Sequence, residues 1–134
     1  MQSVNAEGAE ISDSQLDTAV LDWARQRVVA SGRTVHQITS FSDRSLATGL
    51  FLIDLLAAVE PASIDYRIVT PGDTAEERAL NARLVISAAS KIGCSLPLVW
   101  EDIAEARNPK VILAFIAALL GHATKRSSLS QPAQ

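Results

Sequence analysis

Two runs of apolar residues, 46–59 and 111–120, constrain the fold of this 134-residue chain more than any other feature. The first run is interrupted by Asp54 and the second has only ten residues, so both fall short of the roughly 20 residues that a membrane-spanning helix needs. Their apolar positions go almost all the way round a helix, which is typical of helices buried inside a protein core. We therefore expect a compact helical domain that does not enter a membrane.

A first helix is predicted to begin at Ser12 or Asp13, because Ser12 and Gln15 have the spacing of a capping box, and to end at Gly32. One side of this helix is apolar and should pack against the core: Leu16, Val20 and Trp23, widened by Leu21, Ala24 and Val28. The opposite side is polar and should meet solvent or a partner: Gln15, Thr18, Asp22, Arg25 and Gln26.

The next two helices have their own start and stop signals. Ser42 or Asp43 should cap a central helix that runs to about residue 59, where Pro61 prevents its continuation. Thr74 and Glu77 form a second capping-box pattern that opens a third helix, and Gly93 can end that helix in a left-handed conformation.

The last part of the chain should hold a short helical turn over 100–104 and a final helix that Asn108 caps, with Pro109 at its first position, ending at Gly121. No stretch alternates apolar and polar residues for long enough to predict a strand. We expect an all-α domain over 12–122 with four main helices and short helical turns, a flexible leader over 1–11 and a disordered tail over 123–134.

Composition excludes several classes of function. The formal net charge of −3 argues against a dedicated nucleic-acid binder, which usually carries a basic excess. The single cysteine, Cys94, cannot form an internal disulfide and by itself implies no metal site, so a reducing, cytoplasmic location is expected. The N-terminal segment has neither the basic nor the apolar part of a secretory signal.

Catalytic chemistry has little support in the sequence. His36 should lie in a loop and His122 at the end of the last helix, and no strand–turn–helix motif surrounds a serine. Glu101, Asp102 and Glu105 form an acidic cluster, but the alternating oxygen ligands and central glycine of a calcium loop are missing, so a solvated helix turn is the better interpretation. We predict no enzyme, no cofactor and no metal.

Several conspicuous residues are better explained by structure than by ligand binding. Trp23, Phe41 and Trp100 should anchor the core, and Cys94 should be a small buried residue. Asn81 lies near the start of an apolar helix, where its side chain should satisfy the backbone groups of a loop. Any activity should therefore be carried by a surface.

The order of segments resembles the calponin-homology domain. The features that carry this resemblance are a tryptophan in the first helix, an F-x-D entry to the central helix, an N-A pair in the third helix and an E-D-I turn before the last: Trp23, Phe41 with Asp43, Asn81-Ala82 and Glu101-Asp102-Ile103. Within that family the chain looks most similar to the last of the four calponin-homology domains of fimbrins (plastins), above all over 86–115. The match covers about residues 16–120, a single such domain, so the chain is expected to be either a fragment or a stand-alone relative.

The resemblance implies binding to filamentous actin, a place in the actin cytoskeleton and bundling together with an adjacent calponin-homology domain. Carried onto this sequence, the candidate contacts in the first helix are Gln15, Asp22, Arg25 and Gln26. Since actin is acidic, Arg25 would give salt-sensitive attraction, and Arg27, Arg33 and Arg44 are further candidates. A single patch of this size should bind only weakly without a linked domain.

Three alternatives remain open at this point. The domain could pack on a neighbouring calponin-homology domain and regulate it without touching actin. It could bind microtubules, although the net charge of −3 argues against the basic surface which that would need. The polar side of the first helix could also be merely solvated, because exposed charge on a helix is normal.

Overall fold

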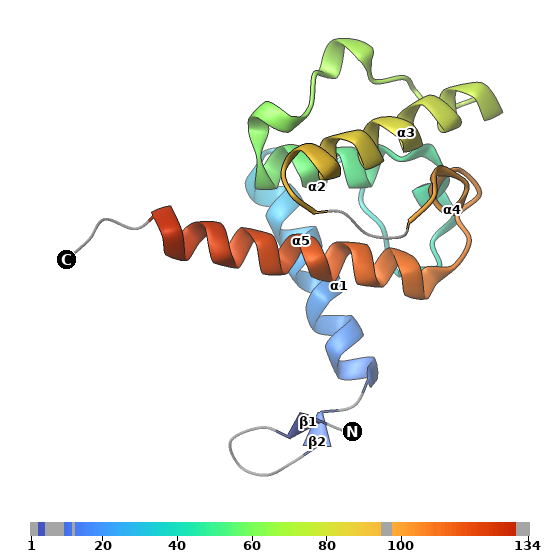
Figure 1. Ribbon diagram of the computed structural model, residues 1–134. Helices are drawn as coiled ribbons and strands as arrows, with labels where there is room; N and C mark the ends of the chain where they lie inside the picture. The colour runs from blue at the N-terminus through green and yellow to red at the C-terminus, as the bar shows by residue number, and fades with distance from the viewer. Residues whose placement is uncertain (1–2, 5–9, 12, 95–97, 131–134) are drawn as a thin grey trace.

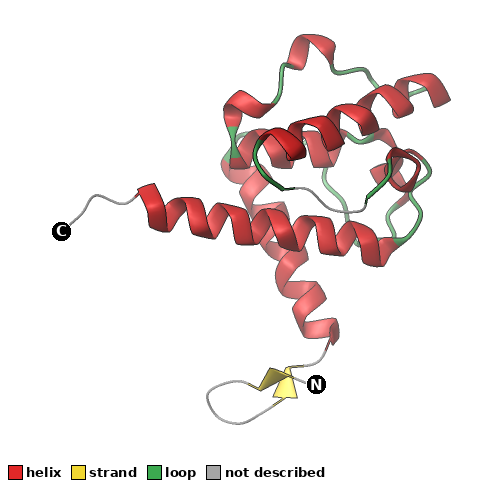
Figure 2. Ribbon diagram, viewed as in Figure 1, coloured by secondary structure: helices red, strands yellow, loops and turns green. Residues whose placement is uncertain are grey.

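The computed structural model describes the backbone of residues 3–4, 10–11, 13–94 and 98–130, and the side chains of 15–94 and 98–124. The domain is all-α, as predicted, and is built from helices of very different length (Figures 1 and 2). The α-helices are α1 (Asp13–Ala30), α2 (Leu50–Val59), α3 (Ala75–Lys91), α4 (Trp100–Ala104) and α5 (Pro109–Ser130). Three 3-10 helices join them, η1 (Arg44–Thr48), η2 (Pro61–Ser63) and η3 (Tyr66–Ile68). Ahead of α1, the two-residue strands β1 (Ser3–Val4) and β2 (Glu10–Ile11) pair antiparallel.

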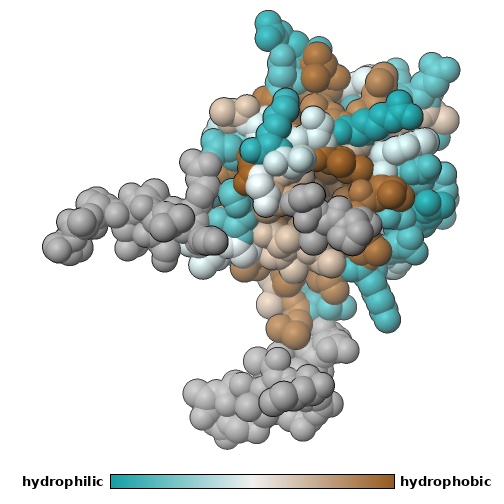
Figure 3. All heavy atoms as spheres, in the orientation of Figure 1, coloured by the Kyte–Doolittle hydropathy of each residue, from teal (hydrophilic) through white to brown (hydrophobic). Residues whose placement is uncertain are grey.

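Helix α2 is the centre of the domain. Nearly all of its side chains are buried, which confirms the prediction drawn from its continuous apolar run. It packs against α1, α3 and α5, so its apolar surface is covered on several sides. In Figure 1, α5 crosses α1 in front of this core. In Figure 3 apolar residues gather on the same face between α3 and α5, with hydrophilic side chains around the edge.

The predicted central helix is divided in two, which corrects the expectation of one helix from residue 43 to 59. Asp43 caps η1 through the backbone N–H of Ser45, which donates to Asp43 Oδ1 at 2.9 Å. Gly49 then takes a left-handed conformation with φ 77°, and α2 begins at the following residue. A Cβ at Gly49 would lie 3.1 Å from Asn81 Cβ, so the close packing of α3 favours glycine at this turn.

Glycine ends α1 and α3, as predicted. Gly32 and Gly93 have φ angles of 89° and 90°. At the first of these ends the N–H of Arg33 donates to the carbonyl of Val28, and the N–H of Gly32 to that of Val29, which is the Schellman pattern. Ser12, one of the two residues of the capping box predicted for α1, lies outside the described residues.

The N-terminus of α3 is capped largely as predicted. The N–H of Glu77 donates to Thr74 Oγ1 at 3.1 Å, while Glu77 Oε1 accepts from the N–H of Asp73 at 2.9 Å instead of returning to Thr74. Both bonds satisfy donors at the start of the helix, where backbone N–H groups lack helical partners.

The last helix begins at Pro109, as predicted, but it does not end at Gly121. Helix α5 continues to Ser130. Gly121 does not have a positive φ, so the backbone stays helical through it. The residues beyond it include Ala123, Lys125 and Arg126, which have good helix propensity. The helix thus extends into the segment predicted to be a disordered tail, while residues 131–134 lie outside the described part of the chain. The predicted domain limits at 12 and 122 stay predictions.

Candidate protein-binding surface

The polar side of α1 is exposed along the length of the helix. Gln15, Asp22, Arg25 and Gln26 are all exposed, and their spacing of three, four and seven residues places them on one side. Val29 lies one turn beyond Arg25 and is 51% exposed, so this side also carries an apolar residue that the sequence interpretation did not include. A role for these residues in binding stays a prediction.

The connector from residue 37 to residue 42 forms a wall beside α1. Gln37 Nε2 donates to the backbone carbonyl of Arg25 at 3.2 Å, and the side chain of Ile38 is fully buried. Asp43 anchors the other part of the connector, because the backbone N–H and the hydroxyl of Thr39 both donate to Asp43 Oδ2. The connector is therefore held against the domain at both ends.

A hollow of about 450 Å³ lies beside the C-terminal half of α1. Gln37 is its one lining residue from the connector, and the helix supplies the others: Asp22, Arg25, Gln26, Val29 and Ala30. Three of the four predicted contact residues therefore line this hollow, and Gln15 does not.

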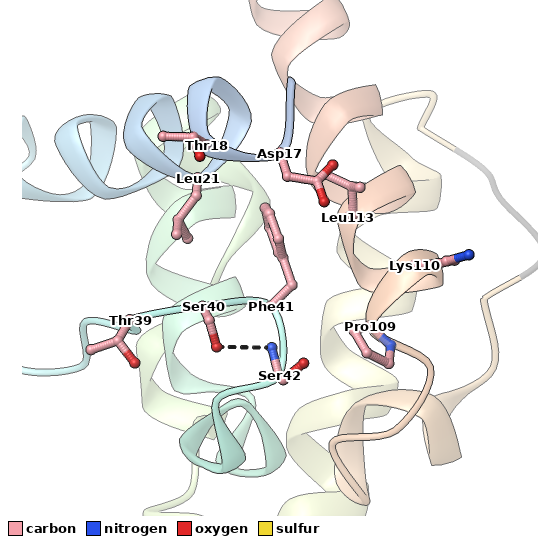
Figure 4. Close-up of a pocket in the computed structure, with 10 residues that line it drawn as sticks. All are labelled: Asp17, Thr18, Leu21, Thr39, Ser40, Phe41, Ser42, Pro109, Lys110 and Leu113. Atoms are coloured by element: carbon pink, nitrogen blue, oxygen red, sulfur yellow. Dashed lines mark hydrogen bonds between the residues drawn. The ribbon is translucent and has the colours of Figure 1, made fainter. Parts of the chain in front are cut away.

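A second hollow of about 420 Å³ lies beside the N-terminal half of α1 (Figure 4). Figure 4 shows the ring of Phe41 pointing toward the space between Leu21 and Leu113, while the amino group of Lys110 points away from them. Phe41 is partly buried against the core, as an anchor should be, and it also lines this hollow. Polar residues complete the lining: Asp17, Thr18, Thr39, Ser40 and Ser42, with Pro109 at the start of α5.

The end of α1 is held by a buried carboxylate in α2. The side chain of Asp54 is 5% exposed, and it accepts a hydrogen bond from Tyr66 Oη at 2.8 Å. Arg33 Nε lies 3.9 Å from Asp54 Oδ1, and its guanidinium stacks 4.7 Å from the centre of the Tyr66 ring. Burial, followed by the bond to Asp54, raises the pKa of Tyr66 well above its ordinary value. Arg33, which the sequence offered as a further filament contact, makes this contact within the domain while its side chain stays 40% exposed, and its role in binding stays a prediction.

The acidic cluster after α3 forms a helical turn, as predicted, and Glu105 in it is exposed, but Asp102 is not solvated. Asp102 is only 4% exposed, and its carboxylate accepts bonds from Asn108 Nδ2 at 2.7 Å, Arg107 Nε at 3.2 Å and the N–H of Val99 at 3.3 Å. Burial opposes ionisation, but the bonds from Asn108, Val99 and Arg107 outweigh it and leave the pKa of Asp102 below its ordinary value. This carboxylate joins α4 to the start of α5.

Asn81 and Cys94 lie where the sequence predicted. Asn81 is fully buried and bonds the backbone of Thr48, at the end of η1, and of Thr70. Cys94 is buried with Sγ 3.8 Å from the carbonyl oxygen of Ala118. Burial also raises the pKa of the Cys94 thiol. His36 is exposed in the loop just before the connector, and His122 lies within α5 instead of at its end. Structural roles therefore account for Asn81 and Cys94.

The described part of the chain holds no cluster of metal-binding side chains. Across residues 15–94 and 98–124, no group of three or more histidine, cysteine, aspartate or glutamate side chains could hold a metal ion. Among the described helices, none combines the length and the apolarity that crossing a bilayer requires. Fold and surface together describe a small helical module with two hollows beside its first helix.

The chain belongs to the calponin-homology (CH) domain family, whose model matches residues 14–125. This is a family of binding modules and not of enzymes. The match spans α1 to α5, so it includes both walls of the two hollows.

The relatives found by sequence include several fimbrins. The chain is 43% identical to fimbrin of Saccharomyces cerevisiae over 120 residues, covering 90% of this chain and 18% of that protein. It is 41% identical to fimbrin-5 of Arabidopsis thaliana over 116 residues, covering 87% of this chain and 16% of that protein. The chain therefore spans less than a fifth of the length of these relatives.

A solved structure agrees with this assignment. The actin-crosslinking core of Schizosaccharomyces pombe fimbrin matches with a TM-score of 0.72 and 39% identity, over 78% of this chain and 22% of that one. The chain is thus a CH domain related to the fimbrin crosslinking core.

Proposed function

We propose that this chain is an actin-filament-binding module of a fimbrin-like crosslinking protein, weak by itself and acting with a tandem CH domain. The observation that carries the proposal is the 39% identity and shared fold with the actin-crosslinking core of a fimbrin. The similarity over 86–115 supports a position corresponding to the last of the four CH domains of fimbrins. The expected location is the actin cytoskeleton.

The proposed contact surface is the exposed side of α1, with Gln15, Asp22, Arg25 and Gln26. Arg25 supports this assignment because it is exposed and lines the hollow beside the C-terminal half of α1. The acidic filament should attract Arg25, and salt should weaken that attraction. One domain offering roughly 800 Å² or less should bind weakly, and linkage to a second domain raises its effective concentration.

Cosedimentation with actin filaments tests the proposal. The chain is measured alone and fused to a second CH domain, with Arg25→Glu introduced into the fusion. Charge reversal at the contact should weaken binding by about tenfold at low salt and by less at high salt. Lys91→Glu is the matched control, because it makes the same change of charge at an exposed position of another helix, at the end of α3.

The outcomes separate the two roles weighed for this domain. Failure of the fusion to pellet with filaments would contradict the proposal. Pelleting that Arg25→Glu leaves unchanged or strengthens would indicate a domain that regulates its neighbour instead of touching actin.

A further inference from the structure

A third hollow, of about 400 Å³, has no lining residue in common with the two hollows beside α1. Arginines from two separate elements line it, Arg44 at the start of η1 and Arg78 in the second turn of α3. The space between them is bordered by small residues: Ala47, Gly72 and Ala104. Because η1 packs against both α3 and α4, three elements enclose this place, which we call the arginine hollow.

The positive charge of the arginine hollow is not neutralised by its own lining. Among the described residues, no carboxylate lies within ion-pair distance of Arg44 or Arg78. Glu105 is the acidic residue of the lining, and its Oε1 is already paired with Arg107 Nη1 at 3.3 Å. Two guanidinium charges therefore remain, in a chain whose formal net charge is −3. A concave place lined by charge of one sign concentrates ions of the other sign.

The guanidinium of Arg78 is oriented by backbone and not by an acid. Its Nη1 donates to the carbonyl of Asp73 at 3.2 Å and lies 3.5 Å from the carbonyl oxygen of Gly72. Its Nε and Nη2 have no acceptor in the part of the chain that the structure describes. A guanidinium that is already held in place, yet keeps free donors, loses little conformational entropy when it binds an anion.

The two walls that carry the arginines are fixed relative to one another. Asn81 Nδ2 donates to the carbonyl of Thr48 in η1 and to that of Thr70 in the loop before α3. Gly72 in the same loop is so close to η1 that a Cβ on it would lie 2.8 Å from Thr48 Cβ. The spacing of the walls is therefore set by buried packing, which is what a preorganised binding site requires.

We propose that the arginine hollow binds a phosphate monoester carried by a soluble small molecule. Such a group has close to two negative charges near neutral pH, which matches the two uncompensated arginines. Its oxygens accept forked bonds from guanidinium groups, whereas a carboxylate has one charge and would leave one arginine unneutralised. The volume of about 400 Å³ is in the range of small-molecule pockets. Since no residue of the proposed actin-contact surface lines this hollow, the inference goes beyond the proposed function.

A chemical-shift titration of the ¹⁵N-labelled chain with glycerol 3-phosphate tests the inference. We expect saturable shifts at the Nε–H groups of Arg44 and Arg78 and at the backbone N–H of Gly72. Acetate, the control ligand, should bind at least tenfold more weakly, because it brings one charge in place of two.

Variants of the lining locate the site. Arg44→Gln should weaken glycerol 3-phosphate binding about tenfold, and the variant should fold because Arg44 is exposed and has no ion pair among the described residues. Arg78→Lys keeps the charge but removes the fork, so it should weaken binding severalfold. Arg27→Gln is the matched control, since it removes the charge of an exposed arginine that does not line the hollow, and it should leave the affinity unchanged.

Four results would overturn the inference. The first is a titration that does not saturate or that acetate reproduces, and the second is saturable binding that Arg44→Gln leaves unchanged. In the third, a phosphoserine peptide binds at least tenfold more tightly than glycerol 3-phosphate, which makes the ligand a phosphorylated protein. In the fourth, neither phosphate compound binds but Arg44→Gln lowers the melting temperature or the filament pelleting of the tandem fusion, which makes Arg44 a contact of the neighbouring domain or of actin. Cosedimentation of the unaltered fusion tests the proposed function separately, so either proposal can fail while the other stands.

Discussion

Replacing Asn81 with alanine should remove a large part of the stability of this domain. The side chain is fully buried and makes three bonds to loop backbone. The N–H of Thr70 donates to Asn81 Oδ1 at 2.9 Å, and Asn81 Nδ2 donates to the carbonyls of Thr48 at 2.8 Å and Thr70 at 2.9 Å. The substitution Asn81→Ala leaves all three backbone groups without that partner.

The magnitude follows from the cost of an unpaired buried group. Each one costs about 1–3 kcal/mol, and partial relaxation of the loops brings the sum for three groups to about 3–5 kcal/mol. A domain of this size has a free energy of unfolding of about 5–15 kcal/mol, so the variant should be marginal or unfolded at physiological temperature.

Urea unfolding followed by far-UV circular dichroism measures this effect. We expect the midpoint for Asn81→Ala to fall with little change in the slope, because the surface exposed on unfolding is nearly the same. Leu80→Ala is the matched control, since Leu80 is the preceding residue of α3 and is 54% exposed. It should change the free energy of unfolding by less than about 0.5 kcal/mol. A loss below about 1 kcal/mol for Asn81→Ala would refute the reasoning, because the loops would then have found other partners for their backbone.

Gly72→Ala should destabilise the domain by about 2 kcal/mol more than Gly32→Ala in the same assay. Both glycines have a positive φ, but a Cβ at Gly72 would lie 2.8 Å from Thr48 Cβ, whereas a Cβ at Gly32 would meet nothing within 4 Å. Equal losses would mean that the clash is relieved by a small shift. Bonds from backbone N–H groups, that of Thr39 above all, lower the pKa of Asp43 to about 2 in the folded chain, against about 3.9 unfolded. A lowered folded pKa stabilises the domain above pH 4, so about 1 kcal/mol should be lost as the pH falls from about 4 to 2. Melting temperatures should show that Asp43→Asn reduces this loss, and an unchanged pH profile would contradict the assignment.

Most helix boundaries could be predicted because their signals are local. A glycine that ends a helix, or a threonine that caps one, acts on backbone groups within about four residues. Gly32, Thr74, Gly93 and Pro109 all mark boundaries that the structure confirms.

The two wrong boundaries depend on contacts distant in sequence or on competing local effects. Gly49 lies inside an apolar run that is compatible with one continuous helix, and it becomes a break where Asn81 packs against it from α3. Gly121 could stop a helix, but here it keeps a helical backbone and α5 continues to Ser130. A glycine permits a left-handed turn without requiring one.

The residues of the candidate surface could likewise be predicted only where the signal is local. Helical periodicity was enough to place Asp22, Arg25 and Gln26 on one exposed side of α1. It could not show that Arg33 is held by Asp54 or that Gln37 faces Arg25, because these pairs come from separate segments.

By itself, the sequence determined the helical class of this protein, most helix ends and the exposed side of its first helix, because each of these depends on residues within one or two turns of one another. Only the tertiary structure decided that two hollows lie beside this helix. Phe41 and Leu113 are 72 positions apart in the chain and line one hollow because the connector and α5 both pack beside α1. A pattern along the chain records which side of a helix is polar, whereas the shape beside that helix is set by whatever distant segment packs there.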